Sequence, residues 1–328
     1  MAPSRALVTG AAGFVGQWLC GALLDAGWEV TGATLEGAPA RPLPGRERHA
    51  AVRWLQADVR RAEDIRAALD VARPDAIFHL AGVSSVPGAA WDPGLTCEVN
   101  VVAAARLLGE VRSRRRAGTL DPVLVVVGSA EQYGRHEGHE LPLGEDAAQR
   151  PLNVYAASKA AQEVVALEAA RSEGLRVVVT RSFNHSGAGQ APHFLMPALV
   201  QRALGLRDSP PEPGRRPTLI IGNRETVRDF LHVADVARAY IHLAERGVAG
   251  EAYNVASGVG HSVGALAERV LSALGLAGAE VTSDPALVRP VEVPALTGDS
   301  AKLRAATGWR PERSIDDIID DLIHAATH

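Results

Sequence analysis

The sequence predicts an α/β fold built on a doubly wound parallel sheet. Short β-rich runs alternate with amphipathic helical stretches through the first half of the chain, which is typical of that fold. The run at 123–127 (VLVVV) is apolar at every position, as expected of a strand buried on both faces. A glycine-rich turn joins the first strand to the first helix. With 328 residues, 47% apolar and 22% charged, the chain can bury a core and is not a disordered class.

Each element follows from its own pattern, apolar and β-branched runs for strands and apolar faces for helices. The predicted strands are 6–8, 28–34, 52–57, 76–80, 123–127 and 176–180. The predicted helices are 14–26, 63–72, 95–116 and 153–172. The regular alternation of predicted strands and helices ends at residue 182, and the predicted loops after it are longer. We therefore expect a dinucleotide-binding domain over 1–182, to which 229–256 returns, and a smaller, mainly substrate-binding lobe over 183–328.

Charge and cysteine usage exclude several classes of function. The formal net charge is −4, so no global field would draw in nucleic acid or an anionic membrane. No apolar run reaches the ~18 residues of a membrane span, and the N-terminus enters a strand pattern at once, which leaves no room for a signal peptide. Cys20 and Cys97 form no disulfide framework, so we expect a cytoplasmic protein. Of 34 Lys and Arg, only Lys159 and Lys302 are lysines.

The strongest early motif is TGAAGFVG at residues 9–16. Gly10 permits a tight turn, Gly13 lets a pyrophosphate approach the backbone, and Gly16 lets the helix pack closely on the strand. The helix N-terminus then faces the phosphates. The alternative is an ordinary strand–helix turn. We predict a dinucleotide site made by Thr9, Gly10, Gly13, Phe14, Val15 and Gly16.

Two other strand ends extend this predicted site. Asp58, followed by Val59, ends the third strand, where its carboxylate can accept a hydrogen bond from an adenine amino group or cap the next helix. Leu80, Ala81 and Gly82 end the fourth strand, where their backbone would line a ribose. The loop 136–140 (HEGHE) lacks helical HExxH spacing, so we expect no metal site.

A second motif is YAASK, which places Tyr155 and Lys159 four residues apart on one helical face. A nearby ammonium favours phenolate, so we expect Lys159 to lower the pKa of Tyr155 and to make it a proton donor or acceptor. Ser129 follows the fifth strand at the ligand edge of the sheet, where its hydroxyl can bind the same substrate oxygen. Glu131 is either a general base or a structural acceptor.

TGAAGFVG, HLAG, GSAEQYG and YAASK together resemble the extended short-chain dehydrogenase/reductase family, over nearly the whole chain. The resemblance implies a Rossmann-type domain with a C-terminal nucleotide-sugar lobe. It also implies a Ser129–Tyr155–Lys159 catalytic set and NAD(H) or NADP(H) as cofactor, with Lys159 also binding the nicotinamide ribose. Glu36 after the second strand would repel a 2′-phosphate, although Arg41, Arg46 and Arg48 leave NADPH open.

Within that family, the second half is similar to GDP-4-keto-6-deoxy-D-mannose reductases. The similar segments are 181–190 (with Ala188 for a usual proline), 222–230, 253–258 and 289–294. The similarity implies reduction at C4 to GDP-D-rhamnose, with the substrate bound by Ser84, Ser129, Asn184, His185, Arg228 and Arg289. Three alternatives remain. The first is a related GDP-mannose 4,6-dehydratase, with Glu131 as acid or base, and the others are a 4-epimerase and a non-catalytic regulator. Family members imply a homodimer through a four-helix interface of 95–116 and 153–172.

Overall fold

The computed structural model describes residues 4–39, 50–209, 212, 215–288 and 293–327. Its centre is a seven-stranded sheet whose order is β10-β6-β5-β4-β1-β2-β3. Every neighbouring pair in it is parallel. The strands are β1 (Arg5–Thr9), β2 (Glu29–Thr34), β3 (Arg53–Gln56), β4 (Ala76–His79), β5 (Val123–Ser129), β6 (Val177–Ser182) and β10 (Ala252–Val255). This confirms the predicted Rossmann-type α/β fold.

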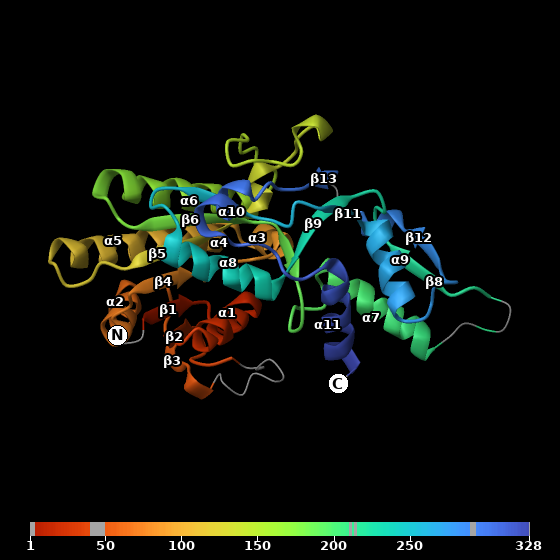
Figure 1. Cartoon of the computed structure of the whole chain (residues 1–328), viewed down its shortest axis with the longest axis horizontal. Coiled ribbons are helices and arrows are strands. Elements are labelled where there is room, and N and C mark those ends of the chain that lie inside the picture. The colour runs from red at the N-terminus through yellow and green to blue at the C-terminus, as the bar shows by residue number, and fades with distance from the viewer. Residues whose placement is uncertain (1–3, 40–49, 210–211, 213–214, 289–292, 328) are drawn as a thin grey trace.

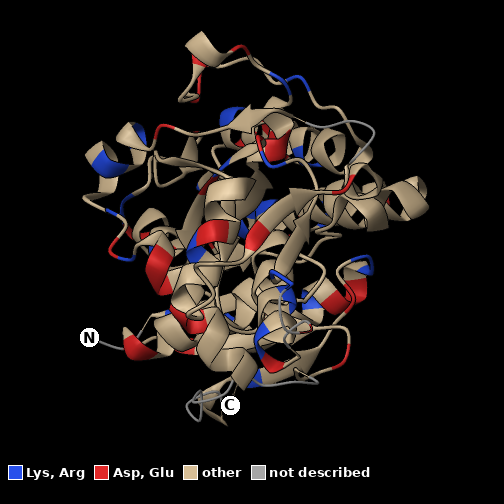
Figure 2. Ribbon diagram, turned by 90° about the vertical axis from the view of Figure 1, so that its right-hand side faces the viewer, with Lys and Arg blue, Asp and Glu red and all other residues tan. Residues whose placement is uncertain are grey.

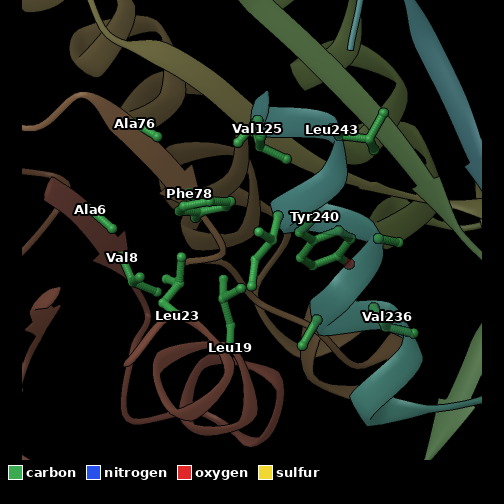
Figure 3. Close-up of a cluster of buried hydrophobic side chains, with 14 of the residues drawn as sticks. Ala6, Val8, Leu19, Leu23, Ala76, Phe78, Val125, Val236, Tyr240 and Leu243 are labelled. Carbon is green, nitrogen blue, oxygen red and sulfur yellow. The ribbon is translucent and has the colours of Figure 1, made fainter. Parts of the chain in front are cut away.

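Helices cover both faces of this sheet (Figure 1). One face carries α1 (Phe14–Asp25) and α8 (Val233–Arg246), and the other carries α2 (Ala62–Ala72), α5 (Ala103–Arg116) and α6 (Val154–Glu173). Figure 3 shows α1, the sheet and α8 meeting through apolar side chains, among them Leu19, Phe78 and Tyr240. Since α8 and β10 belong to this layer, a segment from the second half of the chain completes the large sheet.

The predicted helix at 95–116 is divided in the structure. It consists of α4 (Pro93–Cys97), a π-helical turn η2 (Glu98–Val102) and α5, and the short helix α3 (Val86–Trp91) precedes it. The side chain of Asn100 in the π turn is buried and bonds to both backbone groups of Val83, at 2.8 Å from its N and 3.2 Å from its O. Such turns often occur at functional sites, and this one anchors the segment after β4.

A smaller lobe lies beyond the carboxyl end of the sheet (Figure 1). It packs α7 (Leu195–Asp208), α9 (Val263–Ala273) and α11 (Ile315–Thr327) around a separate apolar core. Its strands are β7 (Asn184–Ser186), β8 (Thr218–Ile221), β9 (Val227–His232), β11 (Gly260–Ser262), β12 (Glu280–Ser283) and β13 (Ala295–Leu296). The short elements η5 (Pro285–Leu287) and α10 (Ala301–Thr307) complete the described chain in this half.

Acidic and basic residues are interspersed along the ribbon in the view of Figure 2. Several form exposed ion pairs, such as Arg114 with Asp70 and Arg116 with Glu173. None of the helices within the described part of the chain has the length and apolar character needed to cross a bilayer.

Candidate active site

The glycine turn between β1 and α1 is too tight for larger residues. Gly10 has a φ of 69°, and a Cβ on it would lie 2.8 Å from the backbone N of Ala81. A Cβ on Gly16 would collide with the carbonyl oxygen of Gly10. These contacts fix the helix N-terminus directly beside the end of β4, as the sequence predicts for these two glycines.

Gly13 has a different environment, because it is exposed and its hypothetical Cβ would meet only the Gly10 oxygen, at 3.2 Å. It is the N-cap residue of α1, and no side chain caps this helix end. The uncapped N–H groups carry the positive end of the helix dipole. A dinucleotide pyrophosphate therefore fits the turn, with Phe14 and Val15 in the first helical positions.

The segment after β4 is held beside this turn. The Thr9 hydroxyl lies 2.8 Å from Nδ1 of buried His79 and accepts a hydrogen bond from the Ala81 N–H at 3.3 Å. Burial, followed by the charge of Lys159, lowers the pKa of His79 to about 3. A Cβ on Gly82 would lie 3.5 Å from Lys159 Nζ, so the predicted ribose segment adjoins that ammonium group.

Asp58 and Val59 lie beyond β3. The Asp58 carboxylate accepts hydrogen bonds from the Arg60 N–H and guanidinium group, and the guanidinium lowers the pKa of Asp58. The capping alternative for Asp58 is wrong, since Arg61 is the N-cap residue of α2. Val59 lines a narrow cavity together with Thr9 and Ala33. This places Val59 on the same side of the sheet as Thr9.

Tyr155 and Lys159 lie in the first turns of α6, whose N-terminus is capped by Asn153 through the Ala156 N–H at 2.8 Å. Lys159 is buried, and its Nζ donates to the Val127 carbonyl at 2.8 Å and to Gln162 Oε1 at 2.9 Å. Burial lowers the pKa of Lys159 to about 8.

The side chains of Ser129, at the end of β5, and Tyr155, in the first turn of α6, interact. Burial raises the pKa of Tyr155, the Ser129 side chain lowers it by less, and the Glu131 carboxylate raises it further. The net shift is upward, so the expectation of a lowered Tyr155 pKa is wrong. The physical reason is that Lys159 points to the Val127 carbonyl and burial dominates.

Glu131 is in the 3₁₀ turn η3 (Ala130–Tyr133), and a second such turn, η4 (Gly138–Glu140), follows in the same loop. The Glu131 N–H donates to Ser129 Oγ at 3.2 Å, and Asn153 Nδ2 donates to its carboxylate at 3.5 Å. Glu131 therefore adjoins both Ser129 and the start of α6. No group of three His, Cys, Asp or Glu side chains within the described ranges is arranged to hold a metal ion.

Besides Ser129, the structure describes four of the predicted substrate residues: Ser84, Asn184, His185 and Arg228. The fifth, Arg289, lies outside the described residues. The His185 ring stacks on Phe14, with centroids 6.2 Å apart and an interplanar angle of 12°, and so joins the lobe to the glycine turn. Asn184 pairs with Phe230 of β9, the strand that contains Arg228. Ser84 is exposed in the segment after β4.

Two residues that support the site escape sequence reasoning. Asn100 also donates to Ser158 Oγ at 2.9 Å and so links the segment after β4 to α6. Asp229, next to Arg228, is buried and accepts hydrogen bonds from Ser257 and from the N–H groups of Gly258 and Gly298. The sequence signal for Asn100 was a polar residue inside the apolar stretch 99–104, and that for Asp229 was its place in the similar segment 222–230.

Comparisons with known proteins agree with this geometry. The family profile for GDP-mannose 4,6 dehydratase matches residues 7–322. GDP-6-deoxy-D-mannose reductase of Pseudomonas aeruginosa is 35% identical over 242 residues, 74% of this chain and 77% of that protein. The structure of RMD from Pseudomonas aeruginosa complexed with NADPH superposes with a TM-score of 0.80 at 29% identity, covering 99% of this chain and 100% of that one.

A third similar protein is the UDP-glucose 4-epimerase of Thermus thermophilus in complex with NAD. Its structure has a TM-score of 0.82 at 30% identity, and 98% of each chain is covered. The profile match over nearly the whole sequence and the 35% identical relative decide the assignment. The chain therefore belongs to the GDP-mannose 4,6-dehydratase family of extended short-chain dehydrogenases/reductases.

Proposed function

We propose that this protein reduces the C4 ketone of a GDP-linked 4-keto-6-deoxy sugar with NADH or NADPH and yields GDP-D-rhamnose. The observation that carries the proposal is the juxtaposition of Ser129, Tyr155 and Lys159 at the end of β5 and the start of α6, with Gly82 beside Lys159 Nζ. The 35% identity to a GDP-6-deoxy-D-mannose reductase supports the choice of substrate. Incubation of that ketosugar with the protein and each reduced cofactor tests the proposal.

The dinucleotide would be held by the turn residues, by the two strand ends and by the catalytic pair. These residues are Thr9, Gly10, Gly13, Phe14, Val15, Gly16, Asp58, Val59, Leu80, Ala81, Gly82, Tyr155 and Lys159. When bound, the reduced nicotinamide supplies the hydride. Structural neighbours hold NADPH or NAD. Glu36 is exposed after β2, whereas Arg41, Arg46 and Arg48 lie outside the described residues.

The two domains divide the work in this proposal. Residues 1–182 would bind the dinucleotide. The segment 229–256 would return to that domain through α8 and β10, while its first residues, 229–232, belong to β9 of the lobe. The remainder of 183–328 would bind the nucleotide sugar, with α7, α9 and α11 as its frame. The Phe14–His185 stack then spans the boundary between the two binding surfaces.

Tyr155 acts as the proton donor. Its pKa lies above the ordinary value of about 10, so the phenol is protonated at neutral pH, which is the state that a reduction requires. It gives this proton to the ketone oxygen as negative charge develops there. The Ser129 hydroxyl donates a hydrogen bond to the same oxygen. Lys159, fixed on the Val127 carbonyl, places a positive charge near the ribose segment at Gly82.

The diphosphate of the substrate needs cationic partners, and the planar arginine fork suits phosphate oxygens. Arg228 and Arg289 are the proposed partners, with Asn184, His185 and Ser84 completing the surface. The buried Asp229 fixes the backbone next to Arg228. Arg228 on β9 is thus the cation that this strand would offer to the GDP moiety.

A dehydratase is the second candidate function, because the Glu131 carboxylate lies close enough to Tyr155 to raise its pKa. Such an enzyme, like an epimerase, regenerates its cofactor. The reductase consumes one reduced nicotinamide for each product molecule. Product formation from a GDP-hexose without added reductant would favour the dehydratase over our proposal.

A second copy of the chain is the proposed macromolecular partner. Apolar side chains are exposed on the α3–α6 region, namely Trp91, Leu95, Val102 and Val164, with Trp91 at 92%. A homodimer that packs α5 and α6 against their copies would cover them. A monomer at micromolar concentration by light scattering would refute this.

Free Cys20 and Cys97 support a reducing, cytoplasmic location.

A further inference from the structure

A buried ion pair lies beneath the Ser129 loop. Glu163 on α6 and Arg181 on β6 have side chains that are 4% and 8% exposed. Arg181 donates from Nη2 to Glu163 Oε1 at 2.6 Å and from Nε to Oε2 at 2.9 Å. This two-point geometry gives a fixed orientation to both side chains.

The other atoms of this pair are also satisfied. Gln132 Nε2 donates to Glu163 Oε2 at 2.8 Å, and Gln149 Nε2 donates to Oε1 at 2.7 Å. Arg181 Nη1 donates to the Tyr133 hydroxyl at 2.9 Å. A fully paired buried network of this kind is rigid. It joins the loop that carries Ser129 to helix α6 and to strand β6.

Gln132 connects this network to Ser129. Its Oε1 accepts the Ser129 N–H at 2.9 Å, and Ser129 Oγ accepts the Glu131 N–H, so the two residues form a capping box around η3. A Cβ on Gly128 would lie 2.7 Å from Gln132 Oε1 and would collide with the Thr180 carbonyl. The absence of a side chain at Gly128 therefore leaves space for the Gln132 amide next to the end of β5.

Helix α6 presents its functional residues in one row. Tyr155, Lys159 and Glu163 follow each other at intervals of four residues and so share a face. The same helix therefore fixes the proton donor directly and Ser129 through Glu163 and Gln132. Neither Glu163 nor Gln132 had a role in the proposed mechanism.

We infer that Gln132 is a positioning residue for Ser129, anchored by the Glu163–Arg181 ion pair, which keeps the Ser129 hydroxyl in register with Tyr155. The inference rests on the proposed reductase function. Only an amide does this, because one end must accept the Ser129 N–H and the other must donate to a carboxylate. Leucine does neither, and glutamate would face Glu163 with a like charge.

The test compares Gln132→Leu with Gln149→Leu, a control that loses a bond to the same carboxylate and the 3.3 Å bond from Gln132 Nε2 but keeps the bond between Gln132 and the Ser129 N–H. Without Gln132, the Ser129 hydroxyl should shift relative to Tyr155, and a shift of about 1 Å in a catalytic group costs roughly 10- to 100-fold in rate. We expect that loss in kcat for Gln132→Leu, with KM for both substrates within about threefold, and a kcat near that of the wild type for Gln149→Leu. Equal kcat losses in the two variants would overturn the inference, as would a wild-type kcat in Gln132→Leu.

A second variant keeps the test decisive if Gln132→Leu does not fold. Gln132→Met keeps the unbranched shape and approximate length of the side chain but loses the amide that binds the Ser129 N–H and Glu163. We expect a kcat loss of at least about tenfold in Gln132→Met, with KM for both substrates within about threefold. A wild-type kcat in Gln132→Met would contradict the inference.

A readout without turnover separates this inference from the proposed function. Ring-labelled tyrosine followed by NMR reports the pKa of Tyr155, which the Ser129 side chain lowers. We expect this pKa to rise in Gln132→Leu and to stay unchanged in Gln149→Leu. No rise in Gln132→Leu refutes the positioning role, whatever the substrate. A wild-type protein that leaves the ketosugar unreduced refutes only the proposed function.

Discussion

The Ser129 side chain acts on the phenol of Tyr155, although Ser129 ends β5 and Tyr155 belongs to α6. This interaction lowers the pKa of Tyr155, yet burial raises it more, so the net shift is above the ordinary value of about 10. The phenol is therefore protonated at neutral pH, which is the state of a proton donor in a ketone reduction.

Replacement of Tyr155 by Phe should remove this proton donor and leave the fold intact. General acid catalysis contributes about 10²- to 10⁴-fold, so we expect kcat for ketosugar reduction to fall by at least about 100-fold. Tyr253→Phe is the control, since its buried hydroxyl only accepts the Val248 N–H at 3.1 Å. Steady-state kinetics check both variants. A Tyr155→Phe enzyme as active as Tyr253→Phe would remove Tyr155 from the mechanism.

Gly13→Ala separates cofactor binding from folding. The added methyl meets only the Gly10 oxygen, at 3.2 Å, so the fold should survive, but it fills the approach to the helix N-terminus. We expect the Kd for NADPH or NADH to rise at least about tenfold by calorimetry. Gly109→Ala in α5, where a Cβ meets nothing within 4 Å, should bind as the wild type does. Unchanged affinity in Gly13→Ala would place the pyrophosphate elsewhere.

Arg228→Met should weaken binding of the GDP moiety. A charge-assisted contact to a diphosphate contributes about 1.5–3 kcal/mol, which corresponds to roughly 10- to 100-fold in the Kd for GDP. Binding of the dinucleotide should not change. Arg269→Met removes an exposed arginine of the same lobe that pairs with Asp316, and its Kd for GDP should match the wild type. If both variants bind GDP equally well, Arg228 is not a substrate residue.

His79 makes the protein sensitive to acid. Its pKa is about 3 in the folded protein against an ordinary value of 6.5, so between these pH values the unfolded chain binds a proton that the folded protein does not. The free energy of unfolding therefore falls as pH decreases from 6.5 towards 3, by up to about 1.4 kcal/mol per pH unit from this group. The dependence should be shallower in His79→Gln and unchanged in the exposed control His139→Gln. Urea unfolding at several pH values measures it, and parallel curves for wild type and His79→Gln would contradict it.

The sequence predicts the parts of this molecule that depend on local patterns. The parallel strands are apolar runs, and the glycine turn needs Gly10 and Gly16 because their neighbours lie too close for a Cβ. The π turn around Asn100 was not predictable, since it depends on a bond to Val83, 17 residues away. The pairing of Glu163 with Arg181 likewise needs α6 and β6 in place. The direction of the Tyr155 pKa shift depends on burial, which a motif does not report.

One measurement tests the central claim most directly. The protein is incubated with GDP-4-keto-6-deoxy-D-mannose and NADPH or NADH, and the loss of reduced-nicotinamide absorbance is compared with the product formed. We predict that one reduced cofactor is consumed for each GDP-D-rhamnose produced, and that Tyr155→Phe loses both signals together. A folded wild-type protein that consumes neither cofactor with this ketosugar would contradict the account.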